Sequence, residues 1–152
     1  MNISYKQAGF IMWAFGCLAT INFLMSAAVP ALVAWPMGIA AQAVMSKLQA
    51  PIWLGTIRGK PYTWVNWTIL VGDFLLNFTG IWAFAKGIRF TDAYAVGVEL
   101  VPDLFAAQDL MTAIIAVVVA LVLAAGPEVS WQMSDEYDKK GSSIAATNPG
   151  SR

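Results

Sequence analysis

The chain has 152 residues, enough for one domain, of which 59% are hydrophobic and 12% charged, with a formal net charge of zero. Soluble domains carry about 25% charged residues, and the deficit here is concentrated in long apolar stretches that indicate membrane spans. Zero net charge gives no reason to expect a nucleic-acid partner. The chain has no histidine and a single cysteine, which excludes the usual zinc ligands, His-dependent nucleophile pairs and an intrachain disulfide.

The first apolar stretch covers residues 8–45. A bilayer core about 30 Å thick takes about 20 helical residues, so this stretch is too long for one span and short for two. Pro30 and Pro36 supply a break. We therefore predict a first span over about 8–29, and an interfacial or re-entrant segment over 31–46 whose full crossing is left open. A cleavable signal peptide is the alternative, but the apolar run exceeds the usual length of its core.

Residues 47–62 are basic and contain two prolines and two glycines, which predicts a connecting loop. A second span is predicted over about 62–85. Residues 87–101 place apolar side chains on alternate positions, which fits either a short extended segment or an interfacial stretch.

A third span is predicted over 107–126, ended by a Gly-Pro pair. The polar residues 127–152 then form a flexible tail or docking arm. The fold class predicted is an all-α integral membrane protein with about three transmembrane helices, a polytopic membrane domain over 1–126 and a polar C-terminal tail.

Orientation is predicted from the basic residues that flank the spans. With three spans, the first loop and the tail share one side of the membrane and carry most of these residues. This favours a plasma (inner) membrane location with a cytoplasmic tail. If residues 31–46 cross fully, the N-terminus moves to the cytoplasmic side. The richer side carries Lys47, Arg58, Lys60, Lys139, Lys140 and Arg152, and the poorer side Lys6, Lys86 and Arg89.

The second span carries a polar stripe. Offsets of seven, four and three residues place its members on one helical face. Asp73 lies about 16 Å into the span, near the bilayer midplane. An aspartate there costs about 2.5–3.5 kcal/mol. This cost is usually lowered when the side chain faces the protein interior, binds a partner or becomes protonated. The stripe consists of Asn66, Asp73, Asn77 and Gly80.

None of the three predicted spans contains Lys, Arg or His, so only neutral partners are available to Asp73 within them. These are Thr20, Asn22, Ser26 and Thr112. We therefore expect a neutral carboxyl group that donates one hydrogen bond, unless another subunit or a ligand supplies a positive group. Two interpretations follow: polar groups that hold helices together, which we favour, or a titrating carboxylate on a proton or cation path.

The third span carries a seam of small residues four positions apart, a pattern that lets another helix approach closely. The seam consists of Thr112, Ala116, Ala120 and Ala124. Four tryptophans near the predicted span ends are expected at the headgroup level. They are Trp35, Trp53, Trp64 and Trp82.

The expected function is that of a non-catalytic small subunit of a larger membrane assembly, which packs helices and docks a partner through its tail. Its partners would be the lipid bilayer, other membrane subunits or copies of itself, and a soluble protein at the tail. No metal site, cofactor or enzymatic activity is predicted. The alternatives are a proton- or cation-conducting component that uses Asp73, and a holin-like protein that oligomerises in the membrane.

Overall fold

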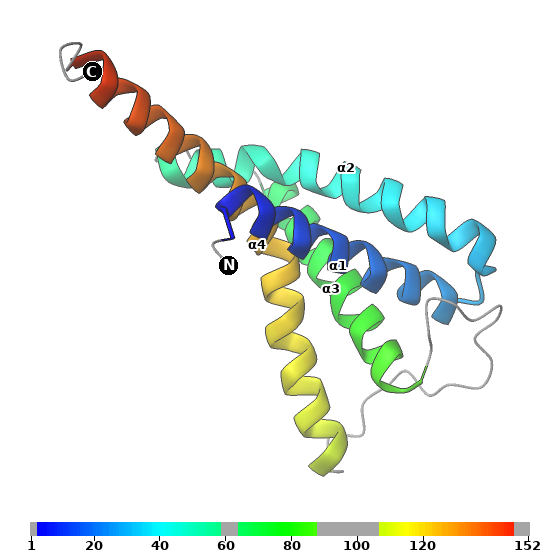
Figure 1. The fold of residues 1–152 in the computed structure, drawn as a ribbon. Helices are drawn as coiled ribbons and strands as arrows, with labels where there is room; N and C mark the ends of the chain where they lie inside the picture. Colours follow the sequence, from blue (N-terminus) through cyan, green and yellow to red (C-terminus); the bar gives the residue numbers. More distant parts are fainter. Residues whose placement is uncertain (1–2, 59–63, 88–106, 148–152) are drawn as a thin grey trace.

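The computed structural model describes residues 3–58, 64–87 and 107–147. Within these ranges the protein is all-helical, and each of its four helices is long and apolar enough to cross a membrane. The helices are α1 (Tyr5–Ser26), α2 (Ala31–Arg58), α3 (Trp64–Ala85) and α4 (Ala107–Thr147). Figure 1 shows α1 lying along α2 and α3, with α4 bent beside them. The segment predicted to be extended or interfacial falls almost entirely outside the described residues.

Both ends of α1 are fixed by the local sequence. At its start, the Ser4 hydroxyl accepts from the Gln7 amide, and the Gln7 side chain accepts from the Ser4 amide, which forms a capping box. At its end, the amides of Ala28 and Val29 return to carbonyls of the last turn, the pattern of a Schellman motif. Ala28 occupies the left-handed position with φ of 62°, where glycine is usual. α1 therefore lies about three residues before the predicted 8–29.

α2 is the main difference from the sequence-based expectation. Residues 31–46 are not a short separate segment but begin a 28-residue helix, about 42 Å long. Residues 47–58, predicted to be a loop, are its C-terminal part. Pro36 lies within the first two turns, where it removes one backbone hydrogen bond but already has a helical φ. The described ranges thus contain four candidate spans, where about three were predicted for the chain.

α4 also continues past its predicted end. It has 41 residues and contains Pro127 in its interior. A proline removes one backbone hydrogen bond and crowds the carbonyl four residues earlier, so it bends a helix without necessarily ending it. Figure 1 shows α4 changing direction between its yellow and orange portions. The predicted polar tail is therefore helical as far as Thr147.

Within the described residues, many large apolar side chains are exposed, and several polar side chains are buried beside an apolar core, which is unusual for a soluble protein. Large apolar side chains are exposed along α1, α2, α3 and α4, and they include Phe10, Leu32, Val71 and Val118. The buried polar side chains are Thr20, Asn22, Gln42, Gln49, Asp73, Asn77, Glu128 and Ser134.

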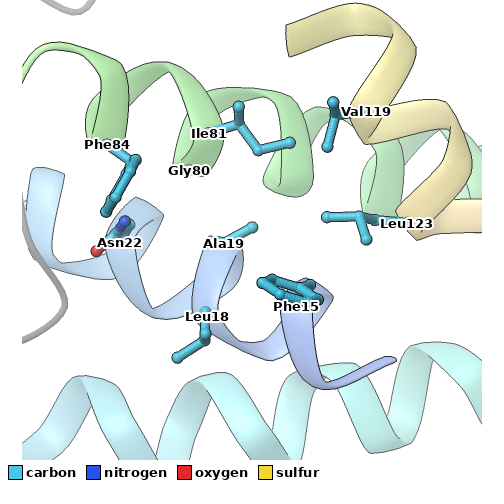
Figure 2. Close-up of a pocket in the computed structure, with 9 residues that line it drawn as sticks. All are labelled: Phe15, Leu18, Ala19, Asn22, Gly80, Ile81, Phe84, Val119 and Leu123. Carbon is cyan, nitrogen blue, oxygen red and sulfur yellow. The ribbon is translucent and has the colours of Figure 1, made fainter. Parts of the chain in front are cut away.

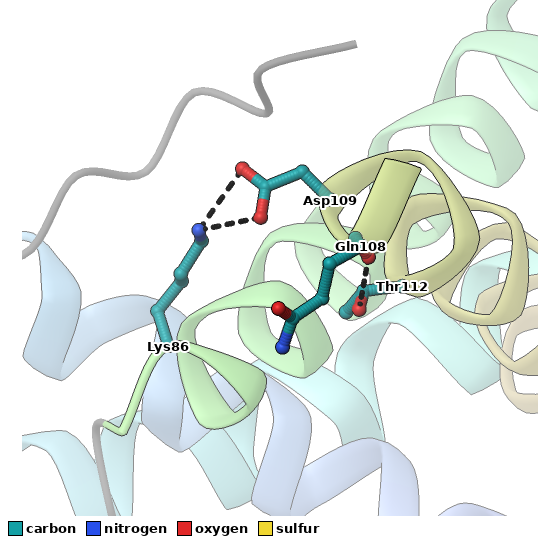
Figure 3. Close-up of polar contacts among 4 residues, drawn as sticks. All are labelled: Lys86, Gln108, Asp109 and Thr112. Atoms are coloured by element: carbon teal, nitrogen blue, oxygen red, sulfur yellow. Dashed lines mark hydrogen bonds and ion pairs between the residues drawn. The ribbon is translucent and has the colours of Figure 1, made fainter. Parts of the chain in front are cut away.

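An ion pair joins helices at each end of the bundle. Lys6 Nζ lies 3.0 Å from Asp138 Oδ2, which ties the start of α1 to the far part of α4. Lys86 Nζ lies 2.9 Å from Asp109 Oδ1, which ties the end of α3 to the start of α4 (Figure 3). The Lys86 ammonium also lies 5.0 Å from the centre of the Trp82 ring. Solvent screens pairs of this kind, so they stabilise the fold only weakly.

Candidate functional site

Asp73 is the centre of a buried hydrogen-bond network. Its side chain is 3% exposed. Its Oδ1 accepts from Gln42 Nε2 at 2.7 Å and from Asn77 Nδ2 at 3.1 Å, and its Oδ2 accepts from Gln49 Nε2 at 2.7 Å. Gln42 Nε2 also donates to Thr20 Oγ1 at 2.8 Å. These five residues, called the Asp73 network below, connect α1, α2 and α3.

The spacing on two helices brings the network together. Gln42 and Gln49 are seven residues apart on α2, and Asp73 and Asn77 are four apart on α3, so each pair lies on one helical face. Both glutamines were missed as partners, because Gln42 lies in the segment predicted to be interfacial or re-entrant and Gln49 lies in the predicted loop. The sequence nevertheless contains a polar stripe on α2 that could have indicated these partners. It has the same offsets of four and three residues as the stripe on α3 and consists of Gln42, Ser46 and Gln49.

Of the predicted stripe, Asp73, Asn77 and Gly80 are buried, whereas the side chain of Asn66 lies outside the described part. Among the partners proposed from the sequence, Thr20 reaches Asp73 only through Gln42. Ser26 and Thr112 instead donate to backbone carbonyls of their own helices. The Asp73 carboxyl accepts three amide hydrogen bonds, where one donated bond was expected.

Two glycines let α1 approach the network closely. A Cβ on Gly80 would overlap the carbonyl oxygen of Ala19, so α1 and α3 touch there through their backbones. A Cβ on Gly16 would lie 3.1 Å from Gln42 Oε1 and 3.4 Å from Asn77 Oδ1. The amide oxygens of Gln42 and Asn77 therefore converge on the glycine surface of α1, while their nitrogens point to Asp73.

Within the described ranges, the amide oxygens of Gln49 and Asn77 accept no hydrogen bond although both are buried. A buried acceptor without a donor costs about 1–3 kcal/mol. Each can still accept a hydrogen bond from a small donor. The network thus binds the Asp73 carboxyl group through amide donors, and the amide oxygens of Gln49 and Asn77 remain available as acceptors. None of its side chains presents an activated nucleophile of the kind used in catalysis.

The predicted seam on α4 lies inside the chain. Ala116, Ala120 and Ala124 are buried, and Thr112 is partly buried. α4 packs against α1 and α3, so these small residues serve contacts within one chain. The opposite face, which includes Val118, is exposed and apolar.

The predicted interface tryptophans occupy different surroundings. Trp64 is 76% exposed and Trp35 is 38% exposed, whereas Trp82 is fully buried. The side chain of Trp53 lies outside the described part. Trp82 packs inside the bundle beneath the Lys86 ammonium, a contact within the protein that needs no lipid headgroup.

An apolar cavity of about 310 Å³ lies between α1, α3 and α4. In Figure 2, Phe15 and Phe84 lie at opposite ends of it. Its polar member is Asn22, whose amide oxygen has no partner in the described part of the chain. The cavity suits hydrocarbon and not a charged ligand. Among residues 3–58, 64–87 and 107–147, no group of three or more His, Cys, Asp or Glu side chains is placed to hold a metal ion.

No protein-family model, curated protein or solved structure matches the chain. The described fold defines the class: an all-helical protein with four helices long and apolar enough to cross a membrane.

Proposed function

We propose that the protein is an integral membrane protein whose four helices all cross the bilayer. The carrying observation is the surface of the bundle: an exposed surface rich in apolar side chains surrounds the buried Asp73 network. In water the same arrangement would expose apolar surface and bury a carboxylate, both unfavourable. In lipid the exposed side chains are solvated, and the polar groups bond to one another.

Four crossings place both chain ends on one side. Lys6, Lys47 and the connection between α2 and α3 then share a side with the far part of α4. Seven of the nine basic residues fall there, and the positive-inside rule makes that side cytoplasmic. The N-terminus is thus placed opposite to the three-span interpretation, while the cytoplasmic tail is kept. The seven are Lys6, Lys47, Arg58, Lys60, Lys139, Lys140 and Arg152; the other two are Lys86 and Arg89.

The function proposed is that of a non-catalytic small subunit in the plasma (inner) membrane that docks a partner through its C-terminal arm, defined as residues 128–147. The arm continues α4 as a helix and projects from the bundle (Figure 1). Its side chains Met133, Glu136 and Tyr137 are exposed. Since the seam and the Asp73 network are used inside the chain, the arm is the surface best suited to a soluble partner.

The test is recovery of the assembly from the native source in mild detergent. The full chain is compared with a chain that stops after Met133, and recovered proteins are quantified by mass spectrometry. A partner recovered in fixed ratio with the full chain should be lost with the shortened one. Val118→Ala, on the lipid-facing side of α4, is the matched control and should retain it. Identical recovery with the full and shortened chains would contradict docking through the arm.

A second candidate function is passage of protons or cations through the bundle. The observation that favours it is the pair of buried carboxyl groups, Asp73 and Glu128, in one small bundle. The three amide donors already bound to Asp73 favour a structural role instead. Ion flux through Asp73→Asn, described in the Discussion, separates the two.

A further inference from the structure

A second cavity, of about 360 Å³, opens between α1, α2 and α4. It shares no lining residue with the Asp73 network or with the apolar cavity of Figure 2. Its lining combines two indole rings, a hydroxyl group and both signs of charge. The residues are Trp13, Ala43, Ser46, Lys47, Glu128 and Trp131.

Glu128 supplies a carboxyl group that is 6% exposed. The Ser46 hydroxyl is hydrogen-bonded to it. Within the described residues, no lysine or arginine forms an ion pair with Glu128. Breaking a buried ion pair leaves an uncompensated charge that is strongly unfavourable, so a carboxylate in this position favours a cation that enters the cavity.

The two indole rings strengthen that preference. Trp13 and Trp131 line the cavity beside the carboxyl group, and indole is the best aromatic partner for an ammonium ion. Trp131 is held in place by α1, because a Cβ on Gly9 would lie 2.6 Å from its Nε1. A primary ammonium suits the site better than a quaternary one, since only the former can donate hydrogen bonds to Glu128.

Lys47 adds a positive group to the lining of the same cavity. Its side chain is exposed, and no ion pair joins it to Glu128 in the described part of the chain. Glu128 and Trp131 follow the main apolar stretch of α4, which places their side of the cavity near the level of lipid headgroups. The long Lys47 side chain can extend toward that level from within α2. Lysine binds phosphate as a point charge. One molecule with a primary ammonium and a phosphate would therefore satisfy both groups.

We propose that this cavity binds the phosphoethanolamine headgroup of a membrane lipid. The ammonium lies on Glu128 between Trp13 and Trp131, and the phosphate lies on Lys47. The inference rests on the proposed membrane location but not on the partner of the C-terminal arm. Soluble phosphoethanolamine shares the headgroup chemistry, and the experiment distinguishes the two sources.

The test measures lipid retained by the purified full chain in mild detergent, by native mass spectrometry. Equimolar phosphatidylethanolamine, phosphatidylcholine and phosphatidylglycerol with identical acyl chains are supplied. The wild type should retain phosphatidylethanolamine preferentially. Glu128→Gln keeps the shape of the side chain but removes the charge, and should reduce that preference on the order of tenfold. Asp135→Asn, an exposed carboxyl on the same helix, is the matched control and should leave it unchanged.

Lys47→Ala separates the two halves of the site. It removes the contact to a phosphate common to all three lipids, so retention should fall with little change in preference. Because Lys47 is exposed, this variant does not depend on repacking the interior. Equal retention of the three lipids by the wild type, or an unchanged preference in Glu128→Gln, would contradict the proposal that this cavity binds the phosphoethanolamine headgroup. Soluble phosphoethanolamine that binds as tightly as the lipid would overturn the assignment to a lipid.

Discussion

Gly80 of α3 lies directly against the backbone carbonyl of Ala19 of α1, with no side chain between them. This contact sets the distance between the two helices one residue before Thr20 on α1 and two turns after Asp73 on α3. Because glycine is the one residue without a Cβ, the close approach depends on its identity.

Gly80→Ala should therefore force α1 and α3 apart and destabilise the bundle. Overpacking of this kind costs about 1–3 kcal/mol, and contact with backbone leaves little room to relax. Gly72→Ala is the matched control on the same helix, since a Cβ there has nothing within 4 Å. Thermal unfolding in detergent, followed by circular dichroism, should give a clearly lower midpoint for Gly80→Ala only. Equal midpoints would show that the helices do not touch at Gly80.

Substitutions at Asp73 should separate hydrogen bonding from charge. Asp73→Asn should be well tolerated, because the Gln49 amide can turn its unpartnered oxygen toward the new NH₂ group. Asp73→Leu removes the hydrogen bonds from Gln42 and Gln49 that join α2 to α3; at about 0.6 kcal/mol for each interhelical bond in a membrane, the loss is about 1 kcal/mol. Unfolding midpoints in detergent check this order. Asn and Leu variants of equal stability would contradict a structural role for the network.

Ion flux in proteoliposomes tests the second candidate function with the same variant. Wild type and Asp73→Asn are reconstituted at matched amounts. A structural role predicts no flux from either protein. Flux from the wild type that disappears in Asp73→Asn, with its stability retained, would establish conduction, because an amide cannot cycle a proton.

The turn between α1 and α2 offers a stabilising substitution. Ala28 has φ of 62° at the Schellman position, where a left-handed conformation costs a non-glycine residue about 1–2 kcal/mol. Ala28→Gly should relieve this strain and, after the entropy of the more flexible unfolded chain, stabilise by up to about 1 kcal/mol. Ala27→Gly, at an ordinary φ of −85°, should destabilise slightly. A midpoint that falls in both variants would contradict the left-handed geometry at Ala28.

Topology can be tested with single cysteines in a Cys17→Ser background. The four-crossing arrangement places Ser4→Cys and Ser143→Cys on one side of the membrane and Ala27→Cys on the other. An impermeant maleimide applied to intact cells should therefore label Ala27→Cys alone. Labelling of Ser4→Cys alone would restore the three-crossing arrangement with its cytoplasmic tail.

The sequence predicted α1, α3 and the first half of α4 closely, because each contains a predominantly apolar run, without proline, about as long as a bilayer is thick. α2 was not predicted as a span because Gln42, Gln49 and Pro36 interrupt its apolar character. The two glutamines are compatible with a membrane span only because they donate hydrogen bonds to Asp73. That pairing depends on the tertiary structure and cannot be read from the local sequence.

The continuation of α4 was missed for a similar reason. Pro127 is a local stop signal, and nothing in the local sequence opposes it. In the fold, contacts on both sides of the proline hold the chain helical. Gly126 packs against Met12, and Trp131 packs against Gly9. The same contacts bring Glu128 to the second cavity, so that site could not be predicted without the bend.

The dependence of α2 on α3 also bears on how the protein is made. Of the four candidate spans α2 is the least apolar, and its two buried glutamines donate to a carboxylate that is synthesised 24 or more residues later. When α2 leaves the ribosome, its polar face has no acceptor in the bilayer, and entry into lipid on its own is unfavourable. α2 should therefore wait at the translocon until α3 emerges, and the two helices should enter the membrane as a pair.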